Sequence, residues 1–233
     1  MEIRWLGHSA FEIKTKNKIL LLDPALKINP NSSCKPKDIK KADYILISHG
    51  HYDHLGDSIE LAKKTKAKII AIVELAVYCQ GKGVKDAAML NICSPMDFQG
   101  IKIGLVPAAH SGGIGLEDGK AVYSGNPVGF IIQSEGKTVY FAGDTGLCAD
   151  LKMIGEVYKP DIAMLPISGS FTMDPKEAAI AASWIKPKVV IPMHYNSLPS
   201  LPKVNVNELI KGVKKRSPKT RCIILKPGDM YRC

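Results

Sequence analysis

The stretch DYILISHGHYDHLGD, residues 43–57, largely decides how the rest of this sequence is interpreted. Its first half is a nearly continuous apolar run, which is typical of a β-strand buried on both faces. Its second half holds three of the chain's six histidines, His49, His51 and His54, with Asp53 among them. A buried strand that ends in clustered imidazoles and a carboxylate indicates a functional site at the end of a sheet, and such a site needs partners from elsewhere in the chain.

The segments around this stretch predict a mixed α/β fold. A helix that begins after Asp57, with Glu60 completing a capping box, links the strand at 43–49 to another at 68–74, and this spacing implies a parallel pair. A second helix is capped by Asp174 and a third covers about 205–215. Short strands are predicted at residues 2–7, 10–15, 18–23, 101–110, 128–134, 137–144, 161–167, 188–194 and 221–225, with a long loop at 111–127. Each half therefore starts with antiparallel strands and continues with strand–helix–strand units, which favours two packed sheets in one domain, residues 1–233.

Composition excludes several classes of protein. The chain has 233 residues, of which 45% are hydrophobic and 23% charged, as in ordinary globular proteins. No apolar run approaches the length needed to span a bilayer, and the N-terminus does not resemble a signal peptide, so we expect a cytoplasmic protein without a membrane partner. The six cysteines are scattered without a C-x-x-C pair, which favours reduced thiols.

The net charge of +10 raises the question of an anionic partner. Lysines cluster at residues 35–41, 63–68 and 214–221, which would suit nucleic acid or a phosphorylated small molecule, or simply a solvated surface. Since no aromatic residues interleave with the lysines as a stacking platform would require, we favour the solvated surface for each run. A general attraction of an anionic small-molecule substrate is still compatible with this charge.

The partners of the histidine cluster follow other predicted strands. His110, Asp144 and His194 each close such a strand, and in an α/β sheet the loops at that edge converge on ligands. His8 lies in the turn of the first hairpin and could reach the same rim. Imidazole with carboxylate suits zinc first, with manganese, iron or nickel as alternatives.

The spacing also suggests how one or two ions would be shared. His49 and His51 are two residues apart and would point the same way in an extended chain, so they can hold one ion. Asp53 and His54 follow a change of chain direction and can face a second position. Two ions need a bridging carboxylate, for which Asp144 is the natural candidate.

These motifs resemble a known family. H-x-H-x-D-H after a buried strand, followed by AAH, FAGDTG and PMH, resembles the metallo-β-lactamase superfamily. WLGHSAFEI, LPISGSFTMDPKEAA and PMHYN resemble its small metal-dependent hydrolases related to L-ascorbate-6-phosphate lactonase. The resemblance covers nearly the whole chain and implies a four-layer αβ/βα sandwich with an internal pseudo-two-fold. It also implies that one metal binds His49, His51 and His110, that another binds Asp53, His54 and His194, and that Asp144 bridges them, although some relatives hold a single ion.

The chemistry that follows is hydrolysis. A bound divalent metal lowers the pKa of its water from 15.7 to about 7, and the resulting hydroxide would attack a small ester-like substrate such as a lactone, ester or phosphoester. Asp53 would bind metal or orient the attacking water, and His8 would contact substrate or support the metals, unless it is an exposed turn residue. Ser168, Tyr195 and Asn196 are further candidates for substrate contact, with simple loop packing as the alternative for each.

Two other functions compete with this hypothesis. A metal-dependent nuclease or phosphodiesterase acting on RNA or nucleotides would use the same metal cluster and the basic surface, but the chain shows no insertion that would serve as an RNA-grasping arm. A metal-binding or oligomeric scaffold without activity is the third class, and the intact ligand set argues against it. The sequence leaves a homo-oligomer open.

Overall fold

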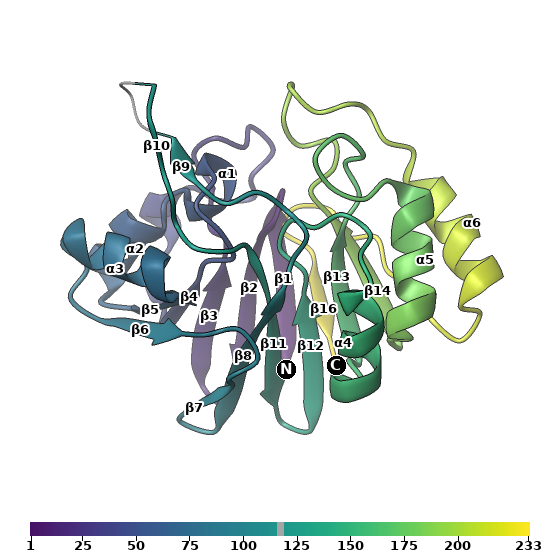
Figure 1. Ribbon diagram of the computed structural model, residues 1–233, viewed down its shortest axis with the longest axis horizontal. Coiled ribbons are helices and arrows are strands. Elements are labelled where there is room, and N and C mark those ends of the chain that lie inside the picture. The colour runs from purple at the N-terminus through teal and green to yellow at the C-terminus, as the bar shows by residue number, and fades with distance from the viewer. Residues whose placement is uncertain (116–118) are drawn as a thin grey trace.

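The computed structural model describes residues 1–115 and 119–233, and two large sheets dominate it (Figure 1). The first sheet has the strand order β16-β1-β2-β3-β4-β5-β6. Its strands are β1 (Glu2–Gly7), β2 (Ala10–Thr15), β3 (Lys18–Leu22), β4 (Tyr44–Leu46), β5 (Lys68–Ile72), β6 (Ala87–Leu90) and β16 (Met230–Arg232). β1, β2 and β3 are antiparallel neighbours, whereas β3 to β6 run parallel. This agrees with the prediction of antiparallel strands at the start of this half, followed by a strand–helix–strand unit.

The second sheet repeats this arrangement in the order β15-β14-β13-β12-β11-β8-β7. Its strands are β7 (Met96–Phe98), β8 (Ile101–Pro107), β11 (Val128–Ser134), β12 (Lys137–Phe141), β13 (Ile162–Pro166), β14 (Val189–Met193) and β15 (Arg221–Cys222). β8, β11 and β12 are antiparallel, and β12 to β15 are parallel. Part of the predicted loop at 111–127 forms a separate ribbon of β9 (Ile114–Gly115) and β10 (Ala121–Val122), and the rest of that prediction includes residues 116–118, which lie outside the described residues.

Helices cover the outer faces of the two sheets. The helices are α1 (Tyr52–Leu55), α2 (Ser58–Thr65), α3 (Val73–Gly81), α4 (Asp150–Tyr158), α5 (Pro175–Ile185) and α6 (Val206–Arg216), with a 3₁₀ turn at Pro36–Asp38. α2 and α3 lie on one side of the molecule and α4, α5 and α6 on the other (Figure 1). Between them the sheets pack face to face, since the rings of Phe11 on β2 and Phe141 on β12 meet edge to face at 6.2 Å. The expected four-layer sandwich is confirmed.

The helix starts show where local sequence signals are reliable. At α5 the predicted capping box is present, because the Asp174 side chain accepts from the backbone of Lys176 and Glu177. At α2 the predicted box is wrong: the Asp57 carboxylate instead accepts from the backbone N–H groups of Leu26 and Lys27 at 2.7 and 3.0 Å. The backbone amides of this neighbouring loop therefore compete with those of the helix N-terminus for the carboxylate. Sequence analysis does not reveal that the loop lies next to Asp57.

Two further elements differ from the expectation. The strand predicted at 68–74 ends at Ile72, and helix α3 begins at once, because a short apolar run does not distinguish a strand from a buried helix. The predicted last strand is only β15, and β16 returns to pair with β1 at the edge of the first sheet. β16 is short and partly exposed, so it lacks the apolar alternation that sequence analysis detects.

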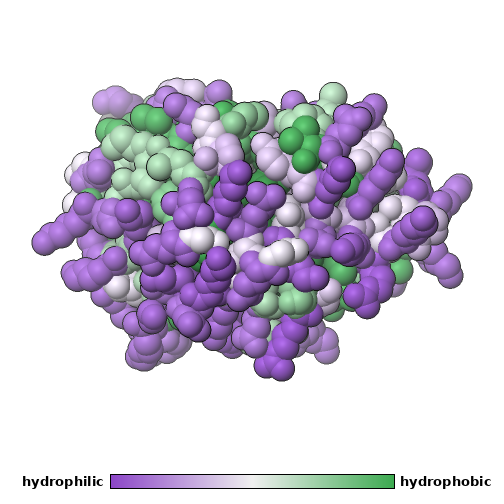
Figure 2. Space-filling model, turned by 90° about the horizontal axis from the view of Figure 1, so that it is seen from below, coloured by the Kyte–Doolittle hydropathy of each residue, from purple (hydrophilic) through white to green (hydrophobic). Residues whose placement is uncertain are grey.

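The two ends of the molecule differ. Both chain termini lie at the lower end in Figure 1, whereas α1 and the β9–β10 ribbon lie at the upper end. Seen from below, the terminal end presents a mostly hydrophilic surface (Figure 2). In the described part of the chain, no helix has both the length and the apolar character to cross a bilayer. The histidine cluster begins α1, so the candidate site lies at the end away from the termini.

Candidate metal centre

The carboxyl ends of strands from both sheets supply the site. β1, β3 and β4 point in one direction, and His8, Asp23 and His49 follow their ends. In the second sheet, β8, β12 and β14 are followed in the same way by His110, Asp144 and His194. The packing of the two sheets brings these strand ends together, which is where ligands bind in α/β sheets.

Some of the residues with strained backbone lie at the same edge. His8, Asp23 and His194 adopt left-handed φ values of 54°, 40° and 57°, a conformation that residues other than glycine rarely adopt. Gly143, just before Asp144, has a φ of 59°, and a Cβ there would lie 2.8 Å from the Cβ of Ser48. The close approach of β4 and β12 thus requires glycine at this position. Such strained positions cluster at functional sites, because the surrounding structure must hold them.

Three imidazoles form the first group, which we call the three-histidine group: His49, His51 and His110. The Nδ1 atom of His51 lies 3.0 Å from Nε2 of His49 and 3.3 Å from Nε2 of His110. His49 is buried, and the other two are partly exposed. Three converging ring nitrogens with one open side match a metal site that keeps a position for a further ligand.

The second group, which we call the four-residue group, consists of His8, Asp53, His54 and His194. Asp53 Oδ2 lies 3.1 Å from Nε2 of His8, 3.4 Å from Nε2 of His194 and 3.9 Å from Nε2 of His54. This group is deeply buried, since only Asp53 retains appreciable side-chain exposure. It contains the three predicted ligands of a second ion together with His8.

Asp144 touches both groups through a single oxygen. Its Oδ2 lies 3.1 Å from Nε2 of His194 and 3.2 Å from Nε2 of His54, both in the four-residue group. The same atom lies 3.7 Å from Nε2 of His110 in the three-histidine group. A carboxylate oxygen in this position can serve two ions.

Sequence reasoning missed Asp23, which orients two of the histidines. Its Oδ2 lies 2.7 Å from Nδ1 of His54 and 2.5 Å from Oγ of Ser48, and that hydroxyl lies 3.0 Å from Nδ1 of His49. Because an ionised carboxylate only accepts, His54 and Ser48 donate to Asp23, and His49 then donates to the Ser48 hydroxyl. Both rings are thereby oriented with Nε2 directed into the site, where that atom would be free to bind a metal ion. The missed signal was the position of Asp23 directly after the predicted strand KILLLD.

Ser197 has a similar effect on His8. His8 Nε2 donates to Asp53, so the neutral ring accepts from the Ser197 hydroxyl, whose Oγ lies 2.6 Å from Nδ1. His8 is 1% exposed and is therefore not the exposed turn residue that sequence analysis held as an alternative. Through its Nε2 hydrogen bond, His8 holds the carboxylate of Asp53 in position.

Unpartnered polar atoms show that the site fits a metal. His54 Nε2, both ring nitrogens of His194 and Asp144 Oδ1 are buried without a hydrogen-bond partner. Orphaned buried polar atoms destabilise a fold by about 1–3 kcal/mol each, so native proteins rarely leave several together. A divalent ion would complete the coordination of the Nε2 atoms and of the carboxylate, and nitrogen with oxygen donors is the set that zinc, manganese and iron accept.

Electrostatics favour positive charge at the centre. Burial lowers the pKa of His8 to about 4 and brings the pKa of His49 well below its usual value, so these rings are neutral. Burial would raise the pKa of Asp144, but the neighbouring His54 and His194 hold it well below the usual range, and Asp144 stays ionised. Burial likewise opposes the charge on His194, yet the Asp144 carboxylate raises its pKa to about 9. The buried carboxylates therefore stabilise a cation, whether a proton or a metal ion.

A cavity of about 300 Å³ opens beside these side chains. Five of the predicted metal ligands line it: His51, Asp53, His110, Asp144 and His194. The rest of its wall consists of Tyr52, Ser111, Phe171, Leu198, Ser200 and Leu201. The volume lies at the lower end of the range for small-molecule sites, so the space suits a small substrate.

The structure does not bring the three other predicted substrate contacts to this cavity. Ser168 is fully buried, and its hydroxyl lies 2.9 Å from that of Thr172. Tyr195 stacks on Trp5 with ring centroids 5.7 Å apart, and the Asn196 side chain bonds the backbone of Val204 through both its polar atoms. All three shape the loops around the site. Tyr52 and Phe171 line the cavity instead.

Comparisons with known proteins agree with this geometry. Residues 2–194 match the family model described as a beta-lactamase superfamily domain. The chain is 44% identical over 231 residues to a UPF0173 metal-dependent hydrolase of Methanopyrus kandleri, covering 99% of each protein. It is 42% identical over 231 residues to a UPF0173 metal-dependent hydrolase of Archaeoglobus fulgidus, covering 99% of this chain and 98% of that one.

A solved structure is similar over the same length. It is Igni18, a metallo hydrolase from the hyperthermophilic archaeon Ignicoccus hospitalis, with 36% sequence identity and a TM-score of 0.88. The superposition covers 100% of this chain and 98% of that one. Fold and sequence similarity therefore extend over the whole chain, including both halves of the site.

Proposed function

Because this chain belongs to the metallo-β-lactamase superfamily and is a metal-dependent hydrolase, we propose that it hydrolyses a small ester-like substrate at a centre of two divalent ions. The substrate class comprises lactones, esters and phosphoesters. The observation that supports the proposal best is the position of Asp144 Oδ2, which lies within 3.7 Å of ring nitrogens from both groups. A single carboxylate shared in this way is what a two-ion hydrolytic site requires.

The ligands of each ion follow from the two groups. One ion would be held by His49, His51 and His110. The other would be held by Asp53, His54 and His194, with Asp144 shared. Zinc is the first candidate for imidazole-rich sites, with manganese, iron and nickel as alternatives. His8 belongs to the four-residue group, but its Nε2–H donates a hydrogen bond to Asp53. We therefore treat His8 as a positioning residue and not as a metal ligand.

The protein's own side chains prepare the reaction. A bound divalent ion supplies Lewis acidity and generates a nucleophile from water at neutral pH. Asp53 lines the cavity, and its carboxylate is ionised because, although burial opposes this, the neighbouring His194 and His8 rings keep its pKa below the usual range. In this state Asp53 can accept a hydrogen bond from water and orient it toward the substrate. Ser197 and His8 hold Asp53 in place for that task.

The nuclease hypothesis gains no support from the position of the lysines. Of the described residues that line the cavity, none belongs to the lysine clusters at 35–41, 63–68 and 214–221. Lys64, in the second cluster, donates to the backbone carbonyls of Pro36 and Lys37 on the surface. We therefore retain the small-molecule substrate and interpret the lysines as a solvated surface.

The experiment that tests the proposal is metal analysis of the purified protein followed by a substrate panel with the matching metal. The panel contains lactones, carboxylic esters, phosphodiester dyes and a short RNA. We expect two ions per chain and turnover of an ester-like substrate that is lost in His49→Ala and Asp144→Ala. Full metal content and activity in both variants would refute the site, and cleavage of RNA alone, with steep salt dependence, would favour the nuclease.

A further inference from the structure

The wall of the site cavity is largely apolar outside its metal-binding groups. Apart from the metal-binding groups, it consists of two aromatic residues, two leucines and two serines. Of the described residues that line it, none is Lys or Arg, although the chain contains 32 of these. The positive charge of the Lys and Arg side chains therefore lies outside this cavity.

Two of the wall residues are aromatic side chains that are left largely in water. Tyr52 is 66% exposed and Phe171 is 63% exposed. They come from different parts of the fold, since Tyr52 begins α1 directly after a predicted metal ligand and Phe171 lies between β13 and α5. Leu198 and Leu201 reach the same cavity from the segment after β14. Apolar side chains from three separate segments thus converge on one small opening, which is the pattern of a ligand contact and not of scattered surface residues.

We infer that the substrate is uncharged and carries an apolar group that packs against Tyr52 and Phe171 while its ester-like bond lies at the metal centre. This inference rests on the proposed function and narrows its substrate class. An anionic group lying away from the ions would lose its hydration without a Lys or Arg to pair with. An alkyl or aryl group would instead cover exposed aromatic surface, which is favourable. The inference replaces the anionic substrate that the net charge suggested.

Binding of unreactive analogues tests the inference without relying on turnover. The probes are two γ-lactams, one with a four-carbon alkyl chain and one with the same chain ending in a carboxylate, titrated calorimetrically into the metal-loaded protein. We expect the uncharged lactam to bind at least about tenfold more tightly, as apolar pockets discriminate. Equal or tighter binding of the carboxylate would overturn the inference.

Variants then locate the contact. Phe171→Ala and Tyr52→Ala should each weaken binding of the alkyl lactam by about tenfold and leave the carboxylate lactam nearly unaffected. Tyr123→Ala is the matched control, because Tyr123 is 64% exposed but does not line the cavity. Metal content measured on each variant separates a lost contact from a damaged metal centre, which matters for Tyr52 because it adjoins His51. Unchanged affinity in Phe171→Ala and Tyr52→Ala with full metal content would also overturn the inference.

Turnover of the corresponding lactones separates this inference from the proposed function. If no ester-like compound of the substrate panel, including these lactones, is hydrolysed but the alkyl lactam is still preferred, the proposed function fails and the inferred apolar contact stands. If the lactone with the carboxylate is hydrolysed faster, the proposed function stands and the uncharged substrate is refuted.

Discussion

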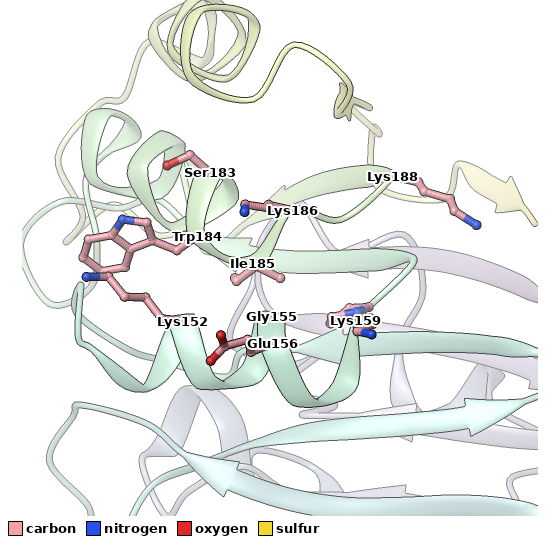
Figure 3. A pocket seen from close by; sticks show the side chains of 10 residues that line it. Lys152, Gly155, Glu156, Lys159, Ser183, Trp184, Ile185, Lys186 and Lys188 are labelled. Carbon is pink, nitrogen blue, oxygen red and sulfur yellow. The ribbon is translucent and has the colours of Figure 1, made fainter.

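Two cavities of this protein differ in size and in chemistry, and the smaller one carries the site. The cavity between α4 and α5 has a volume of about 820 Å³, against about 300 Å³ at the metal centre (Figure 3). Its labelled side chains include Lys152, Lys159, Lys186, Lys188 and Trp184. None of the described residues that line it is a histidine.

The larger cavity already satisfies its own charges. Lys152 lies over the ring of Trp184 at 4.6 Å from the centroid, and Lys188 is paired with Asp161 at 2.8 Å. Lys159 and Lys186 directly follow the last residues of α4 and α5, where positive charge interacts favourably with the helix dipole. At the metal centre, three buried imidazole nitrogens of His54 and His194 and the Oδ1 atom of Asp144 are instead left without a hydrogen-bond partner. Unsatisfied donor atoms, and not volume, therefore distinguish a reactive site from a surface hollow.

Removal of metal should have the largest effect. Chelation should abolish hydrolysis and lower the melting temperature by roughly 5–10 °C, because an ion present at 100 times its dissociation constant stabilises the fold by about 2.7 kcal/mol. The measurement is thermal unfolding and activity before and after dialysis against chelator, with metal added back as the control. An unchanged melting temperature after confirmed metal loss would place no structural ion at this centre.

Loss of the shared carboxylate should come next. Asp144→Ala should lower kcat/KM by more than about 100-fold and reduce metal content, since even supporting residues around metals alter affinity by 10–100-fold. Asp161→Ala is the matched control, because that carboxylate pairs with Lys188 at the larger cavity. Steady-state kinetics and metal analysis of both proteins provide the comparison. Similar losses in the two variants would mean that the distinction between the cavities is wrong.

Asp23→Asn should have an intermediate effect. In the wild type, Oδ2 of Asp23 accepts from the Ser48 hydroxyl and the His54 ring, and Oδ1 accepts from the backbone N–H of Ser48. An amide has only one accepting oxygen, so these hydrogen bonds cannot all be kept and one ring loses its orientation. We expect metal affinity to fall by about 10–100-fold with the fold retained. Competition with a chromophoric chelator measures this. Wild-type affinity would show that the two histidines are oriented without Asp23.

The smallest effect is expected at the larger cavity. Trp184→Ala should leave metal content unchanged and kcat/KM within about twofold, while unfolding free energy falls by about 1–2 kcal/mol through lost packing and the lost contact with Lys152. Urea denaturation and kinetics on the same preparation measure both. A loss of activity above about tenfold would assign this cavity a role in the reaction.

Sequence analysis predicted most of the fold because apolar strands and turn residues act locally. β1 and β2 lie where their apolar pattern predicted them. The capping box at Asp57 was wrong because a distant loop takes the carboxylate, and α3 was missed because its apolar residues resemble those of a strand. These errors share one cause, which is that tertiary contacts outweigh weak local preferences.

The candidate site shows the same division. His49, His51, Asp53 and His54 stand out because four potential ligands within six residues are improbable outside a metal site. Asp23 does not stand out, since a single carboxylate after a strand is common. Ser168 and Tyr195 are close to motif residues in the sequence. In the folded protein, however, Ser168 bonds the Thr172 hydroxyl and Tyr195 packs on Trp5, so neither lines the cavity.

By itself, the sequence determined which side chains are available at the centre, because imidazoles and carboxylates follow strand ends and are able to hold a metal where those ends meet. Only the tertiary structure decided which ring atoms point into the site, through the hydrogen bonds that Asp23 and Ser197 make to histidine rings. Only the tertiary structure also placed Tyr52 and Phe171 on one cavity, where no lysine stands among the described lining residues. The physical reason is that ligand type depends on side-chain chemistry, which is local, whereas the surface that selects a substrate is formed by segments far apart in the chain.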